Sequence, residues 1–327
     1  MKTKILITGS SGFIGTNLVS HLRSDDNELC LIDINKPKVS TMNSLIHQID
    51  IRDYNKLLKA FKEFSPQILI HLAARTDLEE KLDIKGYDVN IQGVENVIRA
   101  AENCGSLKRA IYTSSQLVCK IGYSPETFDE YYPDTLYGES KVLTEKIVRK
   151  NDGSCSTWCI IRPTSIWGPW MWHFIDFLNL VRKGRYFHIG DAKYRKSFGY
   201  IGNFCAQVKG LIDAKPELVH RKTFYLADYE KYFLREWSVA FQEEFGAKPI
   251  RTMPLWLAYC FAGLGDKVQA LGIRKFPLNS FRLNNILTEY LFDLSPIQSI
   301  VPQLPYSIRD GVHLTSNWYL SQIDHNK

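Results

Sequence analysis

Thr8-Gly9-Ser10-Ser11-Gly12-Phe13-Ile14-Gly15 is the stretch that decides the fold of this 327-residue chain. The apolar run Lys4–Thr8 leads into it and predicts a strand, and Phe13–Leu22 follows it and predicts a helix. Glycines at this spacing permit a tight turn, close approach of backbone N–H groups to a pyrophosphate, and close helix–strand packing. The stretch therefore predicts a dinucleotide-binding turn at the start of an α/β sheet.

A second predicted strand, Leu29–Asp33, indicates which dinucleotide is bound. Its final carboxylate can accept hydrogen bonds from the adenosine ribose, and it would repel a 2′-phosphate. Lys36 and Lys38 act in the opposite direction, and the alternative interpretation of Asp33 is an ordinary turn residue. We expect NAD rather than NADP as the cofactor.

Apolar runs alternate with helical patterns through the first half of the chain. Strands are predicted near 4–8, 29–33, 45–49, 67–72, 109–114 and 157–162, and helices near 13–24, 54–64, 86–104 and 134–150. Such alternation builds a parallel sheet with helices on both faces, and the ligand binds at the carboxyl ends of the strands. The predicted fold is α/β, a Rossmann-type doubly wound parallel sheet with a smaller mixed C-terminal substrate lobe.

Tyr137-Gly-Glu-Ser-Lys141 supplies a candidate acid/base group and its activator in one helical turn. A nearby ammonium and an oxidised nicotinamide would lower the pKa of the Tyr137 phenol, which could then take a proton from a substrate alcohol. Ser115, after a predicted strand, is the candidate holder of the substrate oxygen. The alternative is a surface tyrosine beside a charged helix. The expected catalytic residues are Ser115, Tyr137 and Lys141.

These motifs together resemble the extended short-chain dehydrogenase/reductase family, in its NAD-dependent sugar-nucleotide epimerase/dehydratase branch. The glycine stretch matches the family's T-G-x-x-G-x-x-G, His71-Leu-Ala-Ala74 resembles its H-x-A-A turn, and Arg162-Pro-Thr-Ser-Ile-Trp-Gly-Pro169 resembles its R-P segment. Asn90 matches an asparagine that braces the active-site helix. The resemblance implies cofactor contacts with Gly9, Gly12, Phe13, Ile14, Gly15, Asp33, Asp50, Ile51, Leu72, Ala73, Ala74, Asn90, Thr113, Tyr137, Lys141, Pro163, Ser165 and Ile166.

Departures from the family pattern reduce the number of reactions that the chain is expected to catalyse. Dehydratases carry an Asp-Glu pair where Gln116-Leu117 stands here, so a dehydratase is disfavoured. Ser165 replaces a substrate-binding asparagine, and Cys119-Lys120 replaces a Tyr-Gly pair. For the substrate pyrophosphate the resemblance points to Lys196, then Arg195, with Arg282 as a weaker candidate. The expected substrate-binding residues are Ser115, Gln116, Ser165, Arg195, Lys196 and Arg282.

The expected domains are an NAD-binding Rossmann domain and a substrate-binding lobe. The first spans 1–167 with returning strands near 198–204 and 222–227, and the second comprises mainly 168–196 and 229–327. Within the lobe, the apolar segment 254–264 is too short to span a bilayer, which needs about 20 residues. A buried helix is the expectation for this segment. A peripheral membrane contact, or a pocket for a sterol-like or lipid-linked substrate, is the alternative.

Composition agrees with a globular enzyme that binds an anionic small molecule. Hydrophobic residues make up 45% of the chain, and the net charge is +6. Seven cysteines without a Cys-x-x-Cys pair, and an N-terminus without a signal-peptide pattern, favour the cytoplasm. We expect a homodimer with a small-molecule substrate, no nucleic acid, no metal and no stable membrane insertion.

Three functions remain open at this point. The first is an NAD-dependent epimerase of a nucleotide sugar, acting by transient hydride transfer through a keto intermediate. The second is a net NAD-dependent dehydrogenase or ketoreductase on a sugar nucleotide, a sterol-like or a lipid-linked substrate. The third, a non-catalytic NAD-sensing protein, is disfavoured because a sensor needs no proton-transfer residues.

Overall fold

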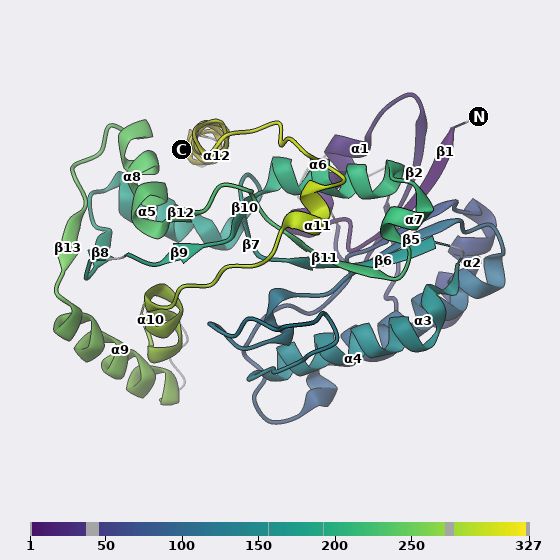
Figure 1. Ribbon diagram of the computed structural model, residues 1–327, viewed down its shortest axis with the longest axis horizontal. Coiled ribbons are helices and arrows are strands. Elements are labelled where there is room, and N and C mark those ends of the chain that lie inside the picture. The colour runs from purple at the N-terminus through teal and green to yellow at the C-terminus, as the bar shows by residue number, and fades with distance from the viewer. Residues whose placement is uncertain (1, 37–45, 156, 192, 272–277, 325–327) are drawn as a thin grey trace. The chain divides into compact units, whose positions relative to one another are not determined.

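The computed structural model describes residues 2–36, 46–155, 157–191, 193–271 and 278–324, and Figure 1 labels most of their helices and strands. The chain divides into two compact units, each described here by itself. The first contains Met1–Ile166, Gly199–Tyr229 and Asp293–Pro305, and the second contains Trp167–Phe198, Glu230–Phe292 and Tyr306–Lys327.

A seven-stranded parallel sheet forms the centre of the first unit, in the order β11-β6-β5-β4-β1-β2-β3. Its strands are β1 (Thr3–Thr8), β2 (Asn27–Asp33), β3 (Ile46–Gln48), β4 (Ile68–His71), β5 (Arg109–Thr113), β6 (Thr157–Pro163) and β11 (Lys222–Leu226). Continuous apolar runs form these strands because both faces of a parallel sheet are covered. The strand order reverses between β1 and β4, and such a switch point is where this type of sheet binds its ligand.

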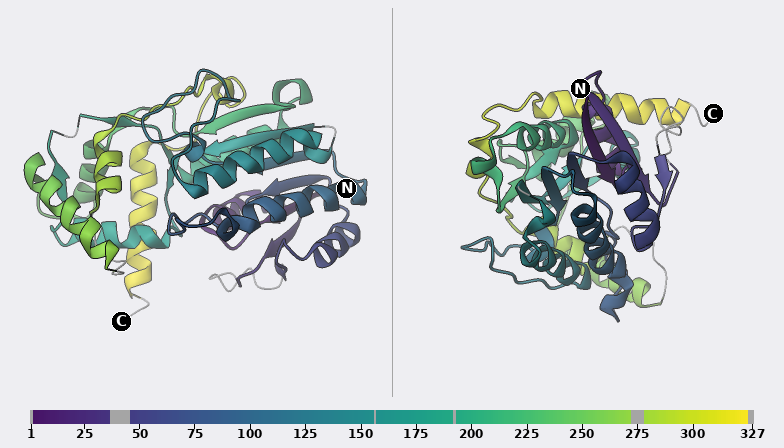
Figure 2. Two further views of the ribbon diagram at one scale, coloured as in Figure 1. Left: turned by 90° about the horizontal axis from the view of Figure 1, so that it is seen from below. Right: turned by 90° about the vertical axis from the view of Figure 1, so that its right-hand side faces the viewer.

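Helices cover both faces of the sheet (Figures 1 and 2). On one face α1 (Phe13–Leu22) packs against α6 (Ile201–Asp213), and on the other α2 (Tyr54–Phe64), α3 (Asp88–Cys104) and α4 (Leu136–Lys150) pack side by side. The core under α2, α3 and α4 includes Leu6, Phe61, Val97 and Trp158, all buried. The predicted Rossmann-type sheet is therefore confirmed. Short elements complete the unit: η2 (Ile84–Tyr87), η3 (Gln116–Val118), η4 (Asp152–Ser154), α7 (Pro216–Val219) and α11 (Ser295–Gln298).

The strand predicted near 198–204 is wrong for most of its length. β10 (Phe198–Tyr200) is only three residues long, and it pairs with β7 (Ser165–Trp167) outside the main sheet. The chain then enters α6, whose buried side chains Ile201, Phe204, Cys205, Val208 and Leu211 follow a helical period. The Asp228 carboxylate fixes the start of α6 by accepting from the Tyr200 N–H at 3.0 Å and from Asn203 Nδ2 at 2.8 Å.

The second unit combines short sheets with five helices among its described residues. β8 (Phe187–Ile189) pairs with β13 (Arg251–Met253), and β9 (Arg195–Lys196) pairs with β12 (Tyr232–Phe233). The helices are α5 (Ile175–Arg182), α8 (Leu234–Glu244), α9 (Leu255–Ala270), α10 (Ser280–Leu287) and α12 (Ile308–Asp324), with η5 (Trp172–Phe174) before α5. Trp167 packs edge-on against Trp237 at 5.6 Å between ring centroids, so it fills the core of this unit.

Candidate active site

At two of the three glycine positions in the first turn, the neighbouring backbone leaves no room for a side chain. A Cβ on Gly9, whose φ is +73°, would lie 2.6 Å from the Ala73 nitrogen, and one on Gly15 would lie 2.2 Å from the Gly9 oxygen. A Cβ on Gly12 would meet nothing closer than the Gly9 oxygen at 3.4 Å, and Gly12 is exposed at the N-cap of α1. The Gly12 side of the turn is therefore open to a ligand, at the helix end that favours anions. The predicted contacts Phe13 and Ile14 are half-buried in the first turn of α1.

Asp33 ends β2 next to this turn, and both of its carboxylate oxygens are engaged. One accepts from the Ser11 N–H at 2.9 Å and the other from the Asn35 N–H at 2.8 Å. Each oxygen keeps a further lone pair, so the buried carboxylate can still accept from two ribose hydroxyls.

Asp50 and Ile51 follow β3, and their side chains have different surroundings. Hydrogen bonds from Arg52 lower the pKa of the Asp50 carboxyl and fix its orientation. Ile51 is buried against α3 at Gly93, where an added Cβ would lie 2.5 Å from Ile51 Cδ1. Ile51 is therefore also a core residue.

The segment after β4 lies against the glycine turn. The Thr8 hydroxyl accepts from the Ala73 N–H at 3.3 Å and is hydrogen-bonded to His71 Nδ1 at 2.8 Å. Burial, together with the nearby Lys141 ammonium, lowers the pKa of His71 to about 3, so this ring stays neutral at pH 7. Leu72, Ala73 and Ala74 are half-buried along the same edge of the sheet.

Asn90 connects this segment to the active-site helix α4. Its side-chain oxygen accepts from the Arg75 N–H at 2.8 Å, and its amide nitrogen donates to the Arg75 carbonyl and to Ser140 Oγ, each at 2.9 Å. Ser140 lies between Tyr137 and Lys141 in α4, so Asn90 fixes the helix that carries both residues. In the structure Asn90 is thus a buried brace.

Ser115, Tyr137 and Lys141 lie together at the carboxyl end of β5. All three are buried, and Lys141 Nζ donates to the Thr113 carbonyl at 2.7 Å. Burial raises the pKa of Tyr137 to about 12, although a hydrogen bond with the Ser115 side chain lowers it in part. Burial lowers the pKa of Lys141 to about 8, against the opposing effect of the Glu145 carboxylate.

The expectation that Lys141 lowers the pKa of Tyr137 is therefore not met by the chain alone. Desolvation exceeds the effect of the neighbouring groups, and Tyr137 is a neutral phenol at pH 7.

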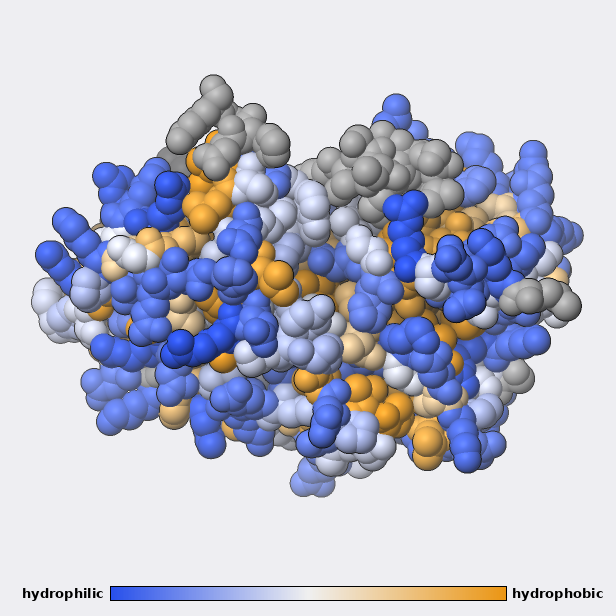
Figure 3. Space-filling model, turned by 90° about the horizontal axis from the view of Figure 1, so that it is seen from above, coloured by the Kyte–Doolittle hydropathy of each residue, from blue (hydrophilic) through white to orange (hydrophobic). Residues whose placement is uncertain are grey.

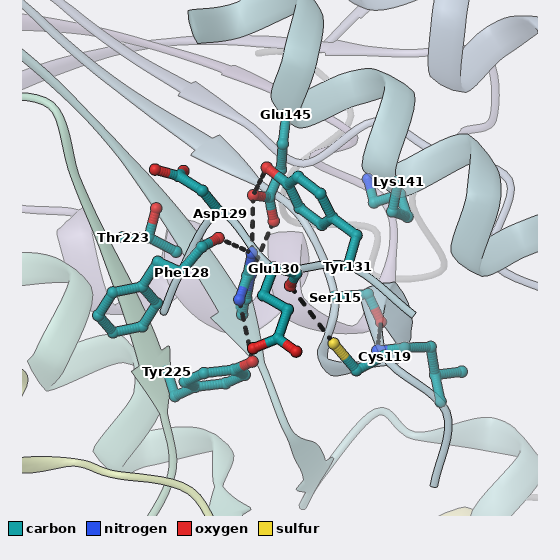
Figure 4. A network of polar contacts seen from close by, with 12 residues as sticks. Ser115, Cys119, Phe128, Asp129, Glu130, Tyr131, Lys141, Glu145, Thr223 and Tyr225 are labelled. Carbon is teal, nitrogen blue, oxygen red and sulfur yellow. Dashed lines mark hydrogen bonds and ion pairs between the residues drawn. The ribbon is translucent and has the colours of Figure 1, made fainter. Parts of the chain in front are cut away.

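A buried ion pair that the sequence analysis missed lies one helical turn beyond Lys141. Arg162 Nε and Nη2 donate to the two Glu145 oxygens at 2.8 and 2.9 Å, and both side chains are inaccessible to solvent. Tyr131 donates to Glu145 at 3.0 Å, as Figure 4 shows. Arg162 donates to the Tyr225 hydroxyl at 3.0 Å. The spacing Tyr137, Lys141, Glu145 places all three on one helix face, which is the sequence signal that could have revealed the pair.

Three buried hydroxyls at this edge of the sheet fit an absent ligand. Ser10 Oγ, Thr113 Oγ1 and Ser114 Oγ have no hydrogen-bond partner in the part of the chain that the structure describes. Ser10 follows β1 within the glycine turn, whereas Thr113 ends β5 and Ser114 follows it, with β4 between the two strands at the same carboxyl edge of the sheet. Buried polar groups are normally satisfied, so these residues fit a bound NAD. Pro163 and Ser165 are half-buried at the end of β6, and Ile166 is buried there.

Two of the predicted substrate residues meet in the first unit. Gln116 Nε2 donates to Ser165 Oγ at 3.4 Å. Gln116 stands where dehydratases of the family carry an aspartate, and Ser165 stands where many family members carry a substrate-binding asparagine. Gln116 begins η3, which follows Ser115 directly. Neither side chain carries a charge that could abstract a carbon-bound proton.

The three predicted phosphate ligands belong to the second unit, and the prediction for Lys196 is not supported. The side chain of Lys196 points into its own unit, where Nζ donates to the Asn285 and Thr288 carbonyls, and burial lowers its pKa to about 8. Neighbouring positions on a strand face opposite sides, so Arg195 is exposed and pairs with Glu289 at 3.1 Å. Arg282 is exposed in the first turn of α10.

Comparison with known proteins relates the chain to enzymes of one family. A family model described as the NAD dependent epimerase/dehydratase family matches residues 5–226. An N-acetyl-α-D-glucosaminyl-diphospho-ditrans,octacis-undecaprenol 4-epimerase of Escherichia coli O157:H7 is 26% identical over 325 residues, covering 96% of this chain and 95% of that protein.

Two further relatives differ in substrate. A 3-β-hydroxysteroid dehydrogenase of Mycolicibacterium neoaurum is 28% identical over 266 residues, covering 76% of this chain and 69% of that protein. The crystal structure of UDP-glucose 4-epimerase from Thermotoga maritima with UDP-glucose has a TM-score of 0.76 at 17% identity, covering 98% of this chain and all of that one.

Proposed function

The chain belongs to the NAD-dependent epimerase/dehydratase family, and on this premise we propose that it inverts one stereocentre of a sugar carried on a nucleoside diphosphate. It is an NAD-dependent enzyme of the extended short-chain dehydrogenase type. The observation that carries the proposal is the buried group of Ser115, Tyr137 and Lys141 at the same carboxyl edge of the sheet as the open glycine turn. We further propose that the first unit binds NAD and the second binds the substrate's carrier.

The chain's own residues supply the proton transfers. NAD, when bound, supplies a hydride acceptor and donor. Ser115 Oγ holds the sugar oxygen. Tyr137, as the phenolate that the Lys141 ammonium and the positive charge of bound NAD together would stabilise, takes the proton of that hydroxyl and returns it after the ketone has turned. Lys141, fixed by the Thr113 carbonyl, holds its ammonium one helical turn from the phenol. Because bound NAD would both accept and give back the hydride, the overall reaction would be an epimerisation without net redox change.

Loss of water is disfavoured for this site. An elimination needs an acid and a base beside the carbon skeleton, and Gln116 with Leu117 supplies neither. The backbone here is also constrained, because a Cβ on Gly138 would lie 2.3 Å from the Leu117 oxygen. The tight contact of η3 with α4 holds Ser115 near Tyr137.

A polyprenyl diphosphate in place of the nucleotide is a second candidate carrier. The Escherichia coli relative, which is similar over nearly the whole of both chains, is named for an undecaprenol-linked substrate. Both carriers present the same sugar-diphosphate to the active site.

The test supplies purified enzyme, with only the NAD that it retains, with UDP-glucose, UDP-N-acetylglucosamine and N-acetylglucosaminyl diphosphoundecaprenol. We expect one of these to give an epimeric product by NMR without accumulation of NADH. If NADH accumulates in proportion to product, the enzyme is a net dehydrogenase and not an epimerase. Net dehydrogenation is the reaction for which the hydroxysteroid relative is named. If only the lipid-linked sugar reacts, the nucleotide carrier is wrong.

Oligomeric state and compartment complete the proposal. We propose a homodimer in the cytoplasm, and the seven free thiols, six of them buried or half-buried in the first unit, are consistent with a reducing compartment. Light scattering on the purified protein should give twice the mass of one chain, and a monomer would contradict the dimer.

A further inference from the structure

Helix α9 of the second unit presents large apolar side chains to solvent. Trp256 is 67% exposed, Tyr259 58%, Leu264 49% and Leu271, directly after the helix, 79%. Trp256, Cys260, Leu264, Lys267 and Leu271 follow one another at intervals of four, four, three and four residues, which places them on one outward stripe. We call this stripe with its neighbour Tyr259 the α9 face.

The helix packs on its own unit through its smallest residues. Its buried positions are Ala258, Ala262 and Gly265, and Ala258 and Ala262 meet Leu283 of α10. Figure 1 shows α9 beside α10. A helix of a water-exposed protein normally has the reverse arrangement, with large apolar residues inside. The expectation of a buried helix at 254–264 is therefore wrong, and the α9 face requires another explanation.

An apolar stripe of this kind differs from ordinary surface. The face drawn in Figure 3 is mostly hydrophilic, with apolar residues gathered in patches between hydrophilic ones. Isolated apolar residues on a surface need no partner, but contiguous ones mark an interaction site. The described helices contain none that is long and apolar enough to cross a membrane. At 16 residues α9 is roughly 24 Å long, shorter than a bilayer core, so a bilayer could receive it only on its surface.

Basic residues surround the α9 face in the sequence. The segment 248–282 contains six basic residues (Lys248, Arg251, Lys267, Arg274, Lys275 and Arg282) and one acidic residue, Asp266. The segment thus has a net charge of +5, out of +6 for the whole chain, so the remainder is nearly neutral. Among these residues Lys248, Arg251, Lys267 and Arg282 are exposed in the structure.

The positive charge of this segment indicates which of two partners, a second copy of the chain or a membrane surface, fits the α9 face. A second copy of the chain, docked about a two-fold axis, would bring two strongly positive segments together. A bilayer with anionic lipids complements both properties, because it accepts the apolar side chains at the headgroup boundary and attracts the basic ones. Trp256 suits the same boundary, where tryptophan is enriched.

We propose that the α9 face docks this enzyme reversibly on anionic membrane surfaces. Trp256, Leu264 and Leu271 enter the headgroup region, while Lys267 and its basic neighbours contact lipid phosphates. The docking goes beyond the proposed function and does not depend on it, because Trp256, Leu264, Lys267 and Leu271 are not residues of the proposed active site. It would bring the enzyme to a lipid-carried substrate if that is the carrier.

Vesicle sedimentation tests the docking. Wild-type protein should bind vesicles of 70% phosphatidylcholine and 30% phosphatidylglycerol at 50 mM salt, and binding should fall with rising salt and with phosphatidylcholine alone. The double variant Trp256→Gln/Leu264→Gln should bind at least about tenfold more weakly, since two apolar side chains no longer enter the bilayer. Leu218→Gln, on an equally exposed leucine of α7, is the matched control and should bind as wild type does.

A label on Cys260, the exposed cysteine of the seven, provides a second readout. A polarity-sensitive maleimide dye there should shift to the blue with anionic vesicles. Absence of both binding and shift would overturn the proposal, as would equal binding by the double variant. A wild-type dimer that the double variant converts to monomer, without vesicle binding by either, would assign the face to a second copy instead. An unchanged far-UV circular dichroism spectrum and an unchanged thermal unfolding midpoint show that each variant keeps its fold.

Discussion

Tyr137 is the residue on which the proposed chemistry depends, and its environment in the chain alone keeps it protonated. Burial raises its pKa to about 12, while the hydrogen bond with Ser115 acts in the opposite direction. The sequence motif predicted the two residues and their proximity. The motif could not predict the balance between desolvation and charge, because that balance depends on how deeply α4 is packed.

Replacing Tyr137 with Phe removes only the ionisable oxygen. We expect turnover to fall by about 10²–10⁴-fold, with NAD binding retained, since a general acid/base contributes on this scale. Steady-state kinetics and NAD titration measure both. Tyr132→Phe, the same change on a tyrosine that is 51% exposed, is the control and should keep activity. Near-normal turnover of Tyr137→Phe would mean that another group transfers the proton.

Lys141 makes stability depend on pH. Its pKa is lowered to about 8 in the folded chain from 10.5, so between these values the unfolded chain binds a proton that the folded chain has lost. The free energy of unfolding should therefore rise with pH across this window, on the order of 1 kcal/mol per pH unit from this group. Below about pH 8 both states are protonated, and the contribution is flat.

Urea unfolding of wild type and Lys141→Met between pH 7 and 10.5 isolates this contribution. We expect the difference in unfolding free energy to move in favour of wild type as pH rises. Lys146→Met, on the exposed side of the same helix, should follow the wild-type trend. A difference that stays constant with pH would show that Lys141 is not held in a depressed state.

At the scale of elements, α4 joins the reaction to the core of the sheet. Tyr137, Lys141 and Glu145 occupy successive turns of one face, and the Glu145 carboxylate is held by Arg162 from β6. The sequence analysis assigned the Arg162 segment to the cofactor. Only the structure shows that the Arg162 side chain points to α4, because the ion pair of Arg162 with Glu145 depends on the distance between α4 and β6.

Glu145→Gln should leave the buried Arg162 guanidinium without its countercharge. We expect a loss of about 3–5 kcal/mol in the free energy of unfolding, the usual effect of breaking a buried ion pair. Glu139→Gln changes an exposed residue of the same helix and should alter stability by less than about 0.5 kcal/mol. Chemical denaturation compares the two. Equal stabilities would indicate that the pair is neutral to folding.

The strands and helices of the sheet were predictable because buried parallel strands are short apolar runs and their helices are amphipathic. The errors fell where that rule fails. Phe198–Tyr200 is strand-like, but the apolar residues after it change to a helical period, and Lys196 faces inward because of its place on a two-residue strand. From its apolar composition α9 was expected to be buried, but its large apolar residues are exposed. Composition alone does not show which side of a helix packs against the rest of the protein.

At the scale of the whole molecule, one chain combines a unit that carries the proposed dinucleotide site with a second unit that has its own core. The first unit holds the glycine turn, Asp33 and the proposed proton-transfer residues. In the second unit, the charged residues that resembled phosphate ligands are engaged at Lys196 and paired at Arg195. The reaction type therefore follows from the first unit, whereas the identity of the sugar and carrier must come from experiment.

The most direct test of a transient hydride transfer is to run the reaction in D₂O with only the NAD that the enzyme retains. The account predicts an epimeric product whose ring carbons carry no deuterium, with no NADH in bulk solution, because the hydride that leaves the sugar is the one that returns. Deuterium at the inverted carbon, or NADH in proportion to product, would contradict it.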